Sequence, residues 1–394
     1  MARAKRTDNK GRVLRVGEQQ RSEDGRYLFR YSDLGGKKRT VYANTLVELR
    51  EKEEQIQRDL QDGIETSDMT VNELFRVYMD ARPNLRGTTI KNYDSMWRNT
   101  FQETLGNIKL SKIKQIHVTS LIAEMEKNGA AARTIRVNLN LLSSVMEMAV
   151  ESDLIRKNPC RGCGKYITGT KNERRALTRA EQAAFINYVN TESKYKNFAP
   201  MYAFMLATGL RIGELTGLRW SDVDFSENVV HVRQQLIYSN FGDGYRYHIQ
   251  ALKTRAGYRD IPLTEDARKS LIRQRELSLM LGWETVRKEI EGVSDFVFIN
   301  REGKPHSTSA LNQKLYRIVD SYNAKHEEKL PHISAHILRH TFCSRMAEAG
   351  LDVKTLQYVM GHSDIGITLN TYTHLDFSTV QENMKEIQSK VLVG

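Results

Sequence analysis

Residues 26–31 read Arg-Tyr-Leu-Phe-Arg-Tyr, with an aromatic ring at every second position. This period of two is typical of a β-strand that has one buried face. Gly35-Gly36 offers a hairpin turn before a further strand at 39–42, and residues 45–61 then have a helical pattern. The first part of the chain is therefore predicted to be a small three-stranded sheet with one helix.

Beyond residue 68 the spacing of apolar residues changes to that of helices. Thr70 and Glu73 form a capping box that opens a first helix, and further helices are expected after Gly87-Thr88 and near His117. A fourth helix is predicted over 132–151, where apolar residues recur every three or four positions. Residues 68–155 are thus predicted to form a compact four-helix unit.

A polar stretch over 156–174, with a proline and glycines, is predicted to be a linker. Thr178 and Glu181 form a second capping box. Apolar β-branched residues near 229–237, a turn at 240–244 and alternation over 245–249 predict a hairpin, and a second hairpin is expected before the strand at 259–263. The expected fold class is multidomain, mainly α with small β-sheets, divided into residues 1–63, 68–155, the linker, and a mixed α/β domain over 175–394.

The charge of the chain favours a polyanionic partner. There are 60 Lys and Arg residues against 48 Asp and Glu, a net charge of +12. Residues 1–40 hold 12 of the basic residues and five of the acidic ones, so more than half of the excess lies there. An excess of this kind is suited to nucleic acid.

Other compositional features exclude several classes of protein. We find no run of about 18 apolar residues, and the opening Met-Ala-Arg-Ala-Lys-Arg lacks the apolar core of a signal peptide. Three cysteines argue against a disulfide scaffold and fit a reducing cytosol. Cys160 and Cys163 form a C-x-x-C, but no second ligand pair completes a zinc site, so we interpret them as incidental linker residues.

Reactive side chains gather near the end of the chain. His336-Ile-Leu-Arg339-His is followed by Gly361-His362 and then by Tyr372. Each alone is weak, because a His and an Arg three apart on a helix are usually a solvated pair and most tyrosines simply pack. Together they can bind a phosphate with a planar guanidinium, move protons and supply a nucleophile.

A second basic motif strengthens this interpretation. Thr208-Gly-Leu-Arg211-Ile-Gly-Glu214-Leu lies upstream, and the combined pattern of T-G-x-R-x-x-E-L, H-x-L-R-H, G-H and a later tyrosine resembles the tyrosine recombinase (phage integrase) family. The resemblance implies a tyrosine-recombinase catalytic fold for the last domain. It also implies Arg211 and Arg339 as the arginine pair, His336 and His362 as the histidines, and Tyr372 as the nucleophile.

The same family has a catalytic lysine in a β-hairpin turn. The pattern K-T-x-x-x-x-R-x-I-P-L fits the stretch from Lys253 to Leu263, so the resemblance implies Lys253 as the general acid. A solvated turn lysine is the alternative, because lysines are mostly exposed. Arg255 is the weaker rival for the same role.

Family chemistry implies a 3′-phosphotyrosyl intermediate and requires neither a cofactor nor a metal. Glu214, one helical turn from Arg211, is expected to orient that arginine or cap nearby structure rather than bind a metal. A type IB topoisomerase and a non-catalytic DNA-binding regulator are the alternatives. The basic module at the start of the chain favours recombination over the topoisomerase.

The order of the three parts is similar to integrases of conjugative transposons. This implies that residues 1–63 bind arm sites in double-stranded DNA and that 68–155 form a core-binding domain. The basic residues expected to contact DNA are Arg26, Arg30, Lys37, Lys38, Arg39, Lys91, Arg98, Arg133 and Arg136.

The end of the chain predicts a protein partner. Val380, Met384, Ile387 and Val391 repeat at helical spacing, which predicts a terminal helix with one apolar stripe. By analogy with the family this helix packs into a neighbour in a DNA-bound homotetramer, with packing on its own domain as the alternative. Excision and DNA-bending accessory proteins are further expected partners, and no membrane is expected.

Overall fold

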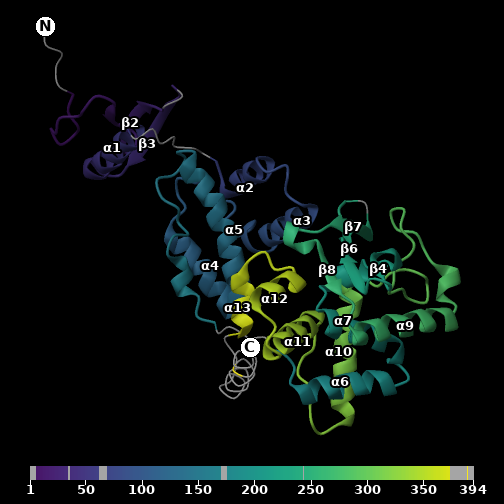
Figure 1. Ribbon diagram of the computed structural model, residues 1–394. Helices are drawn as coiled ribbons and strands as arrows, with labels where there is room; N and C mark the ends of the chain where they lie inside the picture. The colour runs from purple at the N-terminus through teal and green to yellow at the C-terminus, as the bar shows by residue number, and fades with distance from the viewer. Residues whose placement is uncertain are drawn as a thin grey trace. The chain divides into compact units, whose positions relative to one another are not determined.

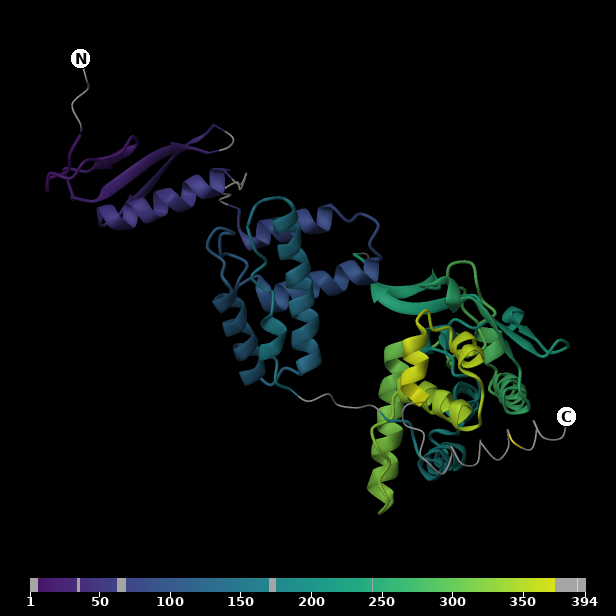
Figure 2. The same cartoon turned by 60° about the vertical axis from the view of Figure 1, so that its left-hand side comes forward.

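The computed structural model describes residues 6–33, 36–61, 69–169, 175–242, 244–372 and 388. The chain divides into two compact units, residues 1–172 and 173–394 (Figures 1 and 2), and each is described by itself. The division falls inside the predicted linker. The boundary predicted between residues 63 and 68 lies outside the described residues.

The first part of unit 1 is the predicted sheet with one helix. Strands β1 (Glu18–Gln20), β2 (Tyr27–Ser32) and β3 (Lys38–Ala43) form an antiparallel sheet in that order, and α1 (Leu46–Gln61) packs on it. The core is built from Tyr27, Phe29, Ala43, Leu46 and Leu49. Alternate residues of β2 therefore face the helix, as the period of two predicts.

The second part of unit 1 is helical. It consists of α2 (Val71–Asp80), α3 (Gly87–Met96), α4 (Gln115–Lys127) and α5 (Ala132–Glu151), close to the predicted positions. Thr70 Oγ1 accepts from the Glu73 amide, and Glu73 Oε2 accepts from the Thr70 amide at 2.7 Å, so the capping box is confirmed. Residues from all four elements share one apolar core.

The interpretation of the two cysteines as incidental linker residues is wrong. Cys160 and Cys163 are buried and belong to the same core as the four helices. Asn158 fastens the segment by donating to the Glu147 carboxylate at 2.6 Å and to the Ser143 carbonyl. A small thiol behaves as an apolar side chain, and the Pro and Gly residues that suggested a linker instead allow the tight turns of a packed segment.

Unit 2 is a helical domain with two small sheets. Its helices are α6 (Arg179–Thr191), α7 (Ala199–Thr208), α8 (Ile212–Thr216), α9 (Glu265–Met280), α10 (Thr308–Lys325), α11 (Ala335–Glu348), α12 (Val353–Met360) and α13 (Ile365–Tyr372). Helix α7 packs against α9 and α11 in the middle of the core, and α11, α12 and α13 pack on one another (Figure 2).

The strands of unit 2 pair differently from one part of the prediction. Strands β6 (Gln234–Asn240) and β7 (Tyr245–Ala251) form the predicted hairpin, with Gln234 opposite Ala251. The prediction of a second hairpin is wrong, because β8 (Arg259–Pro262) pairs instead with β5 (Val229–Val232), in a sheet that also contains β4 (Val223–Asp224). Lys253 therefore lies in the link between the two sheets. The pairing of β5 with β8 spans the whole β6–β7 hairpin, so it depends on tertiary packing and cannot be predicted from the local pattern of apolar residues.

The chain enters unit 2 against helix α11. The amide of Leu177 donates to Thr341 Oγ1 at 3.0 Å, and its carbonyl accepts from the Arg345 guanidinium at 2.6 Å. Both partners belong to α11, so the entering chain is fastened to that helix. None of the helices within the described residues is long and apolar enough to cross a membrane.

Candidate active site

Five parts of unit 2 carry the candidate catalytic residues. Arg211 is the N-cap of α8, His336 and Arg339 lie on α11, and His362 follows the end of α12. Lys253 lies in the link after β7. Tyr372 is the last residue of α13, a helix that packs on both α11 and α12, and its side chain lies outside the described residues.

Arg339 is held inside the domain. It is 4% exposed and donates from Nη1 to the Gly209 carbonyl at 2.7 Å and from Nη2 to the Met360 carbonyl. Burial, and after it the charge of Arg211, lowers the pKa of the guanidinium to about 9, which leaves it protonated at neutral pH. A cation buried beside other cations is stabilised by any anion that binds there.

Arg211 is oriented by Glu214, as the sequence predicted. Its Nη1 donates to Glu214 Oε1 at 2.7 Å, and its Nη2 donates to the Gly361 carbonyl at 2.7 Å. Part of the Arg211 side chain remains exposed, so a ligand can reach it. The arginine pair therefore converges on the end of α12 from two different helices.

Arg259, which the sequence analysis left without a role, is the third guanidinium of this cluster. Its side chain is 0% exposed and contacts both oxygens of Glu214, at 3.2 and 2.9 Å. Burial alone would raise the pKa of the Glu214 carboxyl, but Arg259 and Arg211 outweigh burial and hold that pKa below its usual value. Arg259 is the first residue of β8 and stands in the R-x-I-P-L motif, but nothing in that motif indicated its contacts with Glu214.

His362 lies beside the three guanidiniums. Its Nδ1 is 3.0 Å from Thr368 Oγ1, a fully buried hydroxyl on α13 that the sequence analysis also missed. Burial, followed by the charges of Arg339, Arg211 and Arg259, lowers the pKa of His362 to about 4. The imidazole is therefore neutral at pH 7, and Thr368 fixes its orientation one helical turn before Tyr372.

The remaining candidates lie on the surface. Lys253 and His336 are both exposed, so both are accessible to a large ligand. Arg211, Arg339 and His362 are thus brought together around one helix end. His336 lies one turn before Arg339 on α11, and Lys253 lies in the link after β7. No group of His, Cys, Asp or Glu residues in the described part of the chain could hold a metal ion.

The cluster carries more positive than negative charge. Three guanidiniums share one carboxylate between them: Arg211 and Arg259 contact Glu214, and Arg339 donates to backbone carbonyls. The negative end of the α12 dipole accounts for only part of the charge difference. The remaining excess favours an anion at the exposed side of Arg211. Donors fixed in advance around the position of developing charge are the arrangement that stabilises a phosphoryl transition state.

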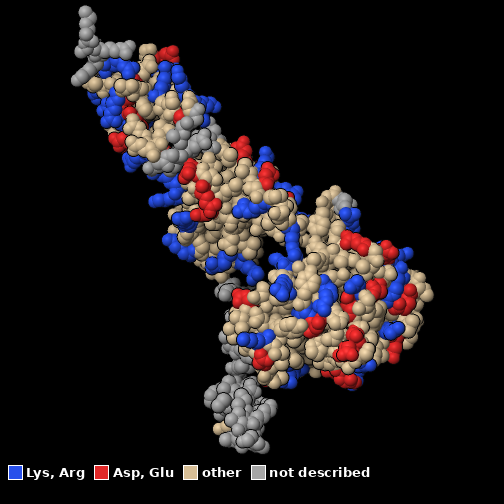
Figure 3. Space-filling model, turned by 45° about the horizontal axis from the view of Figure 1, so that its top comes forward, with Lys and Arg blue, Asp and Glu red and all other residues tan. Residues whose placement is uncertain are grey.

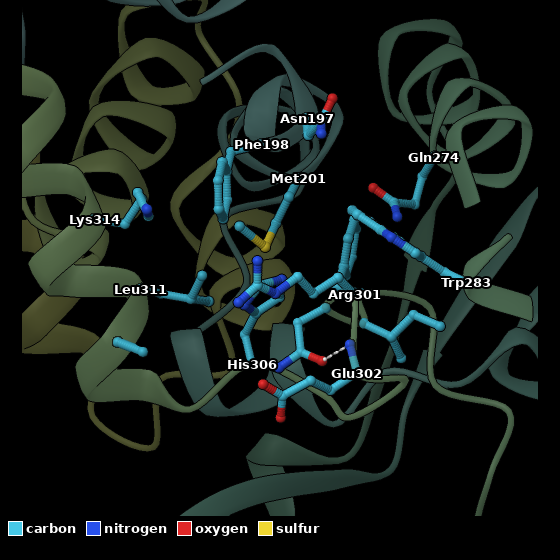
Figure 4. A pocket seen from close by; sticks show the side chains of 14 residues that line it. Asn197, Phe198, Met201, Gln274, Trp283, Arg301, Glu302, His306, Leu311 and Lys314 are labelled. Carbon is cyan, nitrogen blue, oxygen red and sulfur yellow. Dashed lines mark hydrogen bonds between the residues drawn. The ribbon is translucent and has the colours of Figure 1, made fainter. Parts of the chain in front are cut away.

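A cavity of about 340 Å³ lies elsewhere in unit 2 (Figure 4). Phe198, Met201 and Trp283 line it with His306, and burial lowers the pKa of that histidine to about 4. None of the candidate catalytic residues lines this cavity. The candidate site is an accessible surface, which suits a long polymer better than a small enclosed molecule.

The basic residues expected to contact DNA lie mostly on the surface of unit 1. Figure 3 shows Lys and Arg side chains spread over the sheet-and-helix part. Arg30 on β2 and Lys38 on β3 occupy the face of the sheet turned away from α1, and Lys37 precedes β3. Arg26 and Arg39 each pair with an acid, at 2.7 and 3.0 Å, and Arg39 lies on the helix side.

The helical part carries the other four candidates. Arg98, Arg133 and Arg136 are exposed and Lys91 is half-buried. Arg133 and Arg136 are one turn apart near the start of α5. Arg98 lies in the π-helical turn Trp97–Phe101 that follows α3.

Three family profiles match the chain. The profile of the phage integrase family matches residues 175–379, that of the DNA-binding domain of Tn916 integrase matches 2–60, and that of the phage integrase N-terminal SAM-like domain matches 70–125. The first alone spans more than half of the chain.

Whole-length relatives agree with these matches. A transposase from transposon Tn1545 of Streptococcus agalactiae is 34% identical over 98% of this chain and 97% of its own, and a transposase from transposon Tn916 of Enterococcus faecalis is 33% identical over the same shares. The solved structure of a Tn1549 transposon integrase in complex with transposon right end DNA is 31% identical. It covers 81% of this chain and 99% of its own, with a TM-score of 0.73.

Proposed function

The chain belongs to the phage integrase family of tyrosine recombinases, and on that premise we propose that it is the site-specific integrase of a conjugative transposon, cutting and rejoining DNA for integration and excision. The observation that carries the site assignment is the convergence of Arg211 and Arg339 beside His362 at one helix end. The whole-length likeness to the Tn1545 and Tn916 transposases supports the assignment to a transposon.

In the proposed reaction Tyr372 is the nucleophile. Its hydroxyl oxygen attacks the scissile phosphorus, the P–O5′ bond breaks, and a 3′-phosphotyrosyl bond forms. A tyrosine with a reference pKa of about 10 is mostly protonated at neutral pH, so its proton must be accepted by a neighbour, for which we propose His336. Lys253 gives a proton to the departing 5′ oxygen.

Arg211 and Arg339 bind the non-bridging oxygens of the phosphate, and His362 donates a further hydrogen bond. The arginines are suited to this role, because the planar guanidinium can donate to two phosphate oxygens at once. The neutral state of His362 leaves one ring nitrogen able to donate. The phosphotyrosyl bond conserves the energy of the broken phosphodiester, so a 5′ hydroxyl from a partner strand can reverse the step without a nucleotide cofactor.

We propose a division of DNA binding among three domains. Residues 1–63 bind arm sites, 68–155 bind the core site, and 175–394 cut the strand, with 156–174 connecting the last two. The profile matches to 2–60, 70–125 and 175–379 support these boundaries. The exposed face of the N-terminal sheet, with Arg30 and Lys38, is the proposed contact with the arm-site groove.

Assembly is the second part of the proposal. The stripe of Val380, Met384, Ile387 and Val391 lies outside the described residues, and we propose that it packs into a neighbouring protomer of a homotetramer on DNA. Packing within one protomer is the alternative. Excision and DNA-bending proteins assist the reaction, which takes place in the bacterial cytosol or nucleoid.

A covalent complex with DNA tests the catalytic role. A duplex with the transposon end and a nick beside the scissile phosphate should trap wild-type protein as a slow band in a denaturing gel. Tyr372→Phe should bind the same duplex and give no such band, because the nucleophilic oxygen is gone. A Tyr372→Phe protein that behaves as wild type would support the non-catalytic regulator instead.

Strand exchange separates recombination from relaxation. Two duplexes with different end labels are mixed with the protein, and the labelled products are sized. An integrase should join labels from different duplexes, whereas a type IB topoisomerase reseals each strand to its original partner. Rejoining confined to the original partner would refute the integrase assignment while leaving the tyrosine chemistry intact.

A further inference from the structure

Arg259 has no part in the reaction proposed above, yet its guanidinium contacts three separate segments. Besides both oxygens of Glu214, it donates from Nε to the Val359 carbonyl at 2.6 Å and from Nη1 to the Gly257 carbonyl at 2.9 Å. A charge removed from water in this way is stable only when it is fully paired. Arg259 thus joins α8, the end of α12 and the link that contains Lys253.

The end of α12 is bound by guanidiniums at three consecutive positions. Each carbonyl oxygen there accepts from a different arginine: Val359 from Arg259, Met360 from Arg339 and Gly361 from Arg211. These are carbonyls that a helix leaves without an internal partner. His362 is the next residue, so its position relative to the arginine pair follows from these three bonds.

Glu214 is shared between Arg211 and Arg259. Both of its oxygens contact Arg259, and Oε1 also accepts from Arg211. If Arg259 were removed, the buried carboxylate would keep Arg211 as its basic partner in this cluster. The carboxylate would then hold the exposed arginine more tightly and compete with a bound phosphate for its donors.

We propose that Arg259 is a positioning residue for strand cleavage. It neutralises Glu214 and fixes the end of α12, so that Arg211 and His362 are arranged for the scissile phosphate before DNA binds. Arg259 itself does not contact DNA, because its side chain is buried. This inference rests on the proposed function, and the experiments below separate the two.

Two substitutions separate the charge of Arg259 from its shape. Arg259→Met removes both, whereas Arg259→Lys keeps the charge and loses the planar fork. Misplacement of a reacting group by about 1 Å can cost about 100-fold in rate. We expect single-turnover cleavage to fall about 100-fold in Arg259→Met and at least about tenfold in Arg259→Lys, with DNA affinity changed less than about threefold in both.

Arg287 offers a matched control. It also donates to both oxygens of one carboxylate, Glu284, and to two backbone carbonyls, those of Ser294 and Phe296, but it lies outside the arginine cluster. Arg287→Met should lower the unfolding temperature without a comparable loss of cleavage. If Arg259→Met does not fold, the cleavage rate of Arg259→Lys tests the proposal instead. Cleavage by Arg259→Lys at the wild-type rate would overturn the proposal.

Titration of His362 gives a readout that a purely supporting side chain would not change. Arg259 is one of the cations that lower the pKa of this histidine. Histidine NMR of the full chain should show the pKa of His362 raised in Arg259→Met and held low in Arg259→Lys. Equal titration in the two variants would contradict an electrostatic part for Arg259.

The outcomes distinguish this inference from the function it rests on. Failure of the wild-type protein to form any covalent complex refutes the catalytic proposal. A covalent complex formed at the wild-type rate by both Arg259 variants refutes only the positioning role. Equal losses of cleavage and DNA binding also refute it, because they indicate damage to the whole domain.

Discussion

At the scale of single residues, the candidate site is dominated by its unbalanced charge. Arg211 and Arg259 share one carboxylate with Arg339 buried nearby, and burial together with these three charges holds His362 neutral. An isolated site of this kind is electrostatically costly, and the cost is relieved when a phosphate enters. The residues that bind the proposed substrate are therefore also residues that limit the stability of the free protein.

Part of the pH dependence of stability follows from His362 and part from the buried His306. The pKa of His362 is about 4 in the folded protein against an ordinary value of 6.5, so the unfolded chain binds more protons between these values. Stability should therefore rise with pH across this window and be complete above it. With allowance for partial exposure, we expect a contribution of about 1–2 kcal/mol.

Urea unfolding at pH 4.5 and 6.5 measures this contribution. His362→Gln should remove part of the difference in unfolding free energy between the two pH values. The exposed His332, replaced by Gln, controls for the loss of a histidine from the same unit. An unchanged pH dependence in His362→Gln would contradict the low pKa.

The sequence could predict those site residues that stand in a recognisable short motif. Arg211, Arg339 and His362 stand in short patterns with fixed spacing, and the fold brings them together. Arg259 and Thr368 act through contacts that depend on the tertiary fold, so no local spacing indicated their roles. Those roles became visible only once α12 and α13 were in place.

At the scale of elements, the end of α12 depends on Gly361. This residue has φ of +61°, and a Cβ there would lie 3.0 Å from both the Ala256 carbonyl oxygen and Arg259 Nη1. The backbone thus lies directly on the link between β7 and β8. A side chain at this position would separate two segments that carry catalytic candidates.

Gly361→Ala should therefore impair cleavage. Gly350, after α11, is the control, because it also has a positive φ but a Cβ there would meet no atom within 4 Å. Both alanine variants should lose about 1 kcal/mol to backbone strain. Only Gly361→Ala should also slow single-turnover cleavage, by at least about tenfold. Equal rates in the two variants would contradict the packing argument.

Element prediction succeeded where periodicity was local. The helix over 132–151 has the predicted bounds, and the β6–β7 hairpin follows from its turn. The partner of β8 was predicted wrongly because β5 lies beyond the whole hairpin in sequence. The buried cysteines were misread for a related reason, since polar neighbours and glycines hid a segment that packs on a helical core.

At the scale of the whole molecule, more than half of the excess positive charge lies in residues 1–40, the part of the chain that contains most of the N-terminal sheet. Arg30 and Lys38 face away from α1, whereas Lys52 and Arg58 lie on α1 beside Glu48 and Glu54. If the outer face of the sheet binds DNA, the two pairs should differ in effect although their charges are equal.

Salt dependence measures this difference. The Arg30→Ala/Lys38→Ala double variant should lower the slope of log affinity against log salt by about 0.9 for each phosphate that it no longer neutralises, measured with arm-site duplex. Lys52→Ala/Arg58→Ala removes the same charge from α1 and should change the slope less. Equal changes would show that only total charge matters.

The attachment of Leu177 to α11 has a mechanical consequence. The same helix carries Arg339, and the two bonds that fasten Leu177 reach Thr341 and Arg345, within two turns of it. A pull transmitted through the connecting segment is therefore delivered first to the helix that holds the proposed phosphate ligand. Tension between DNA-bound parts of the protein would therefore act on the position of Arg339, and so on phosphate binding itself.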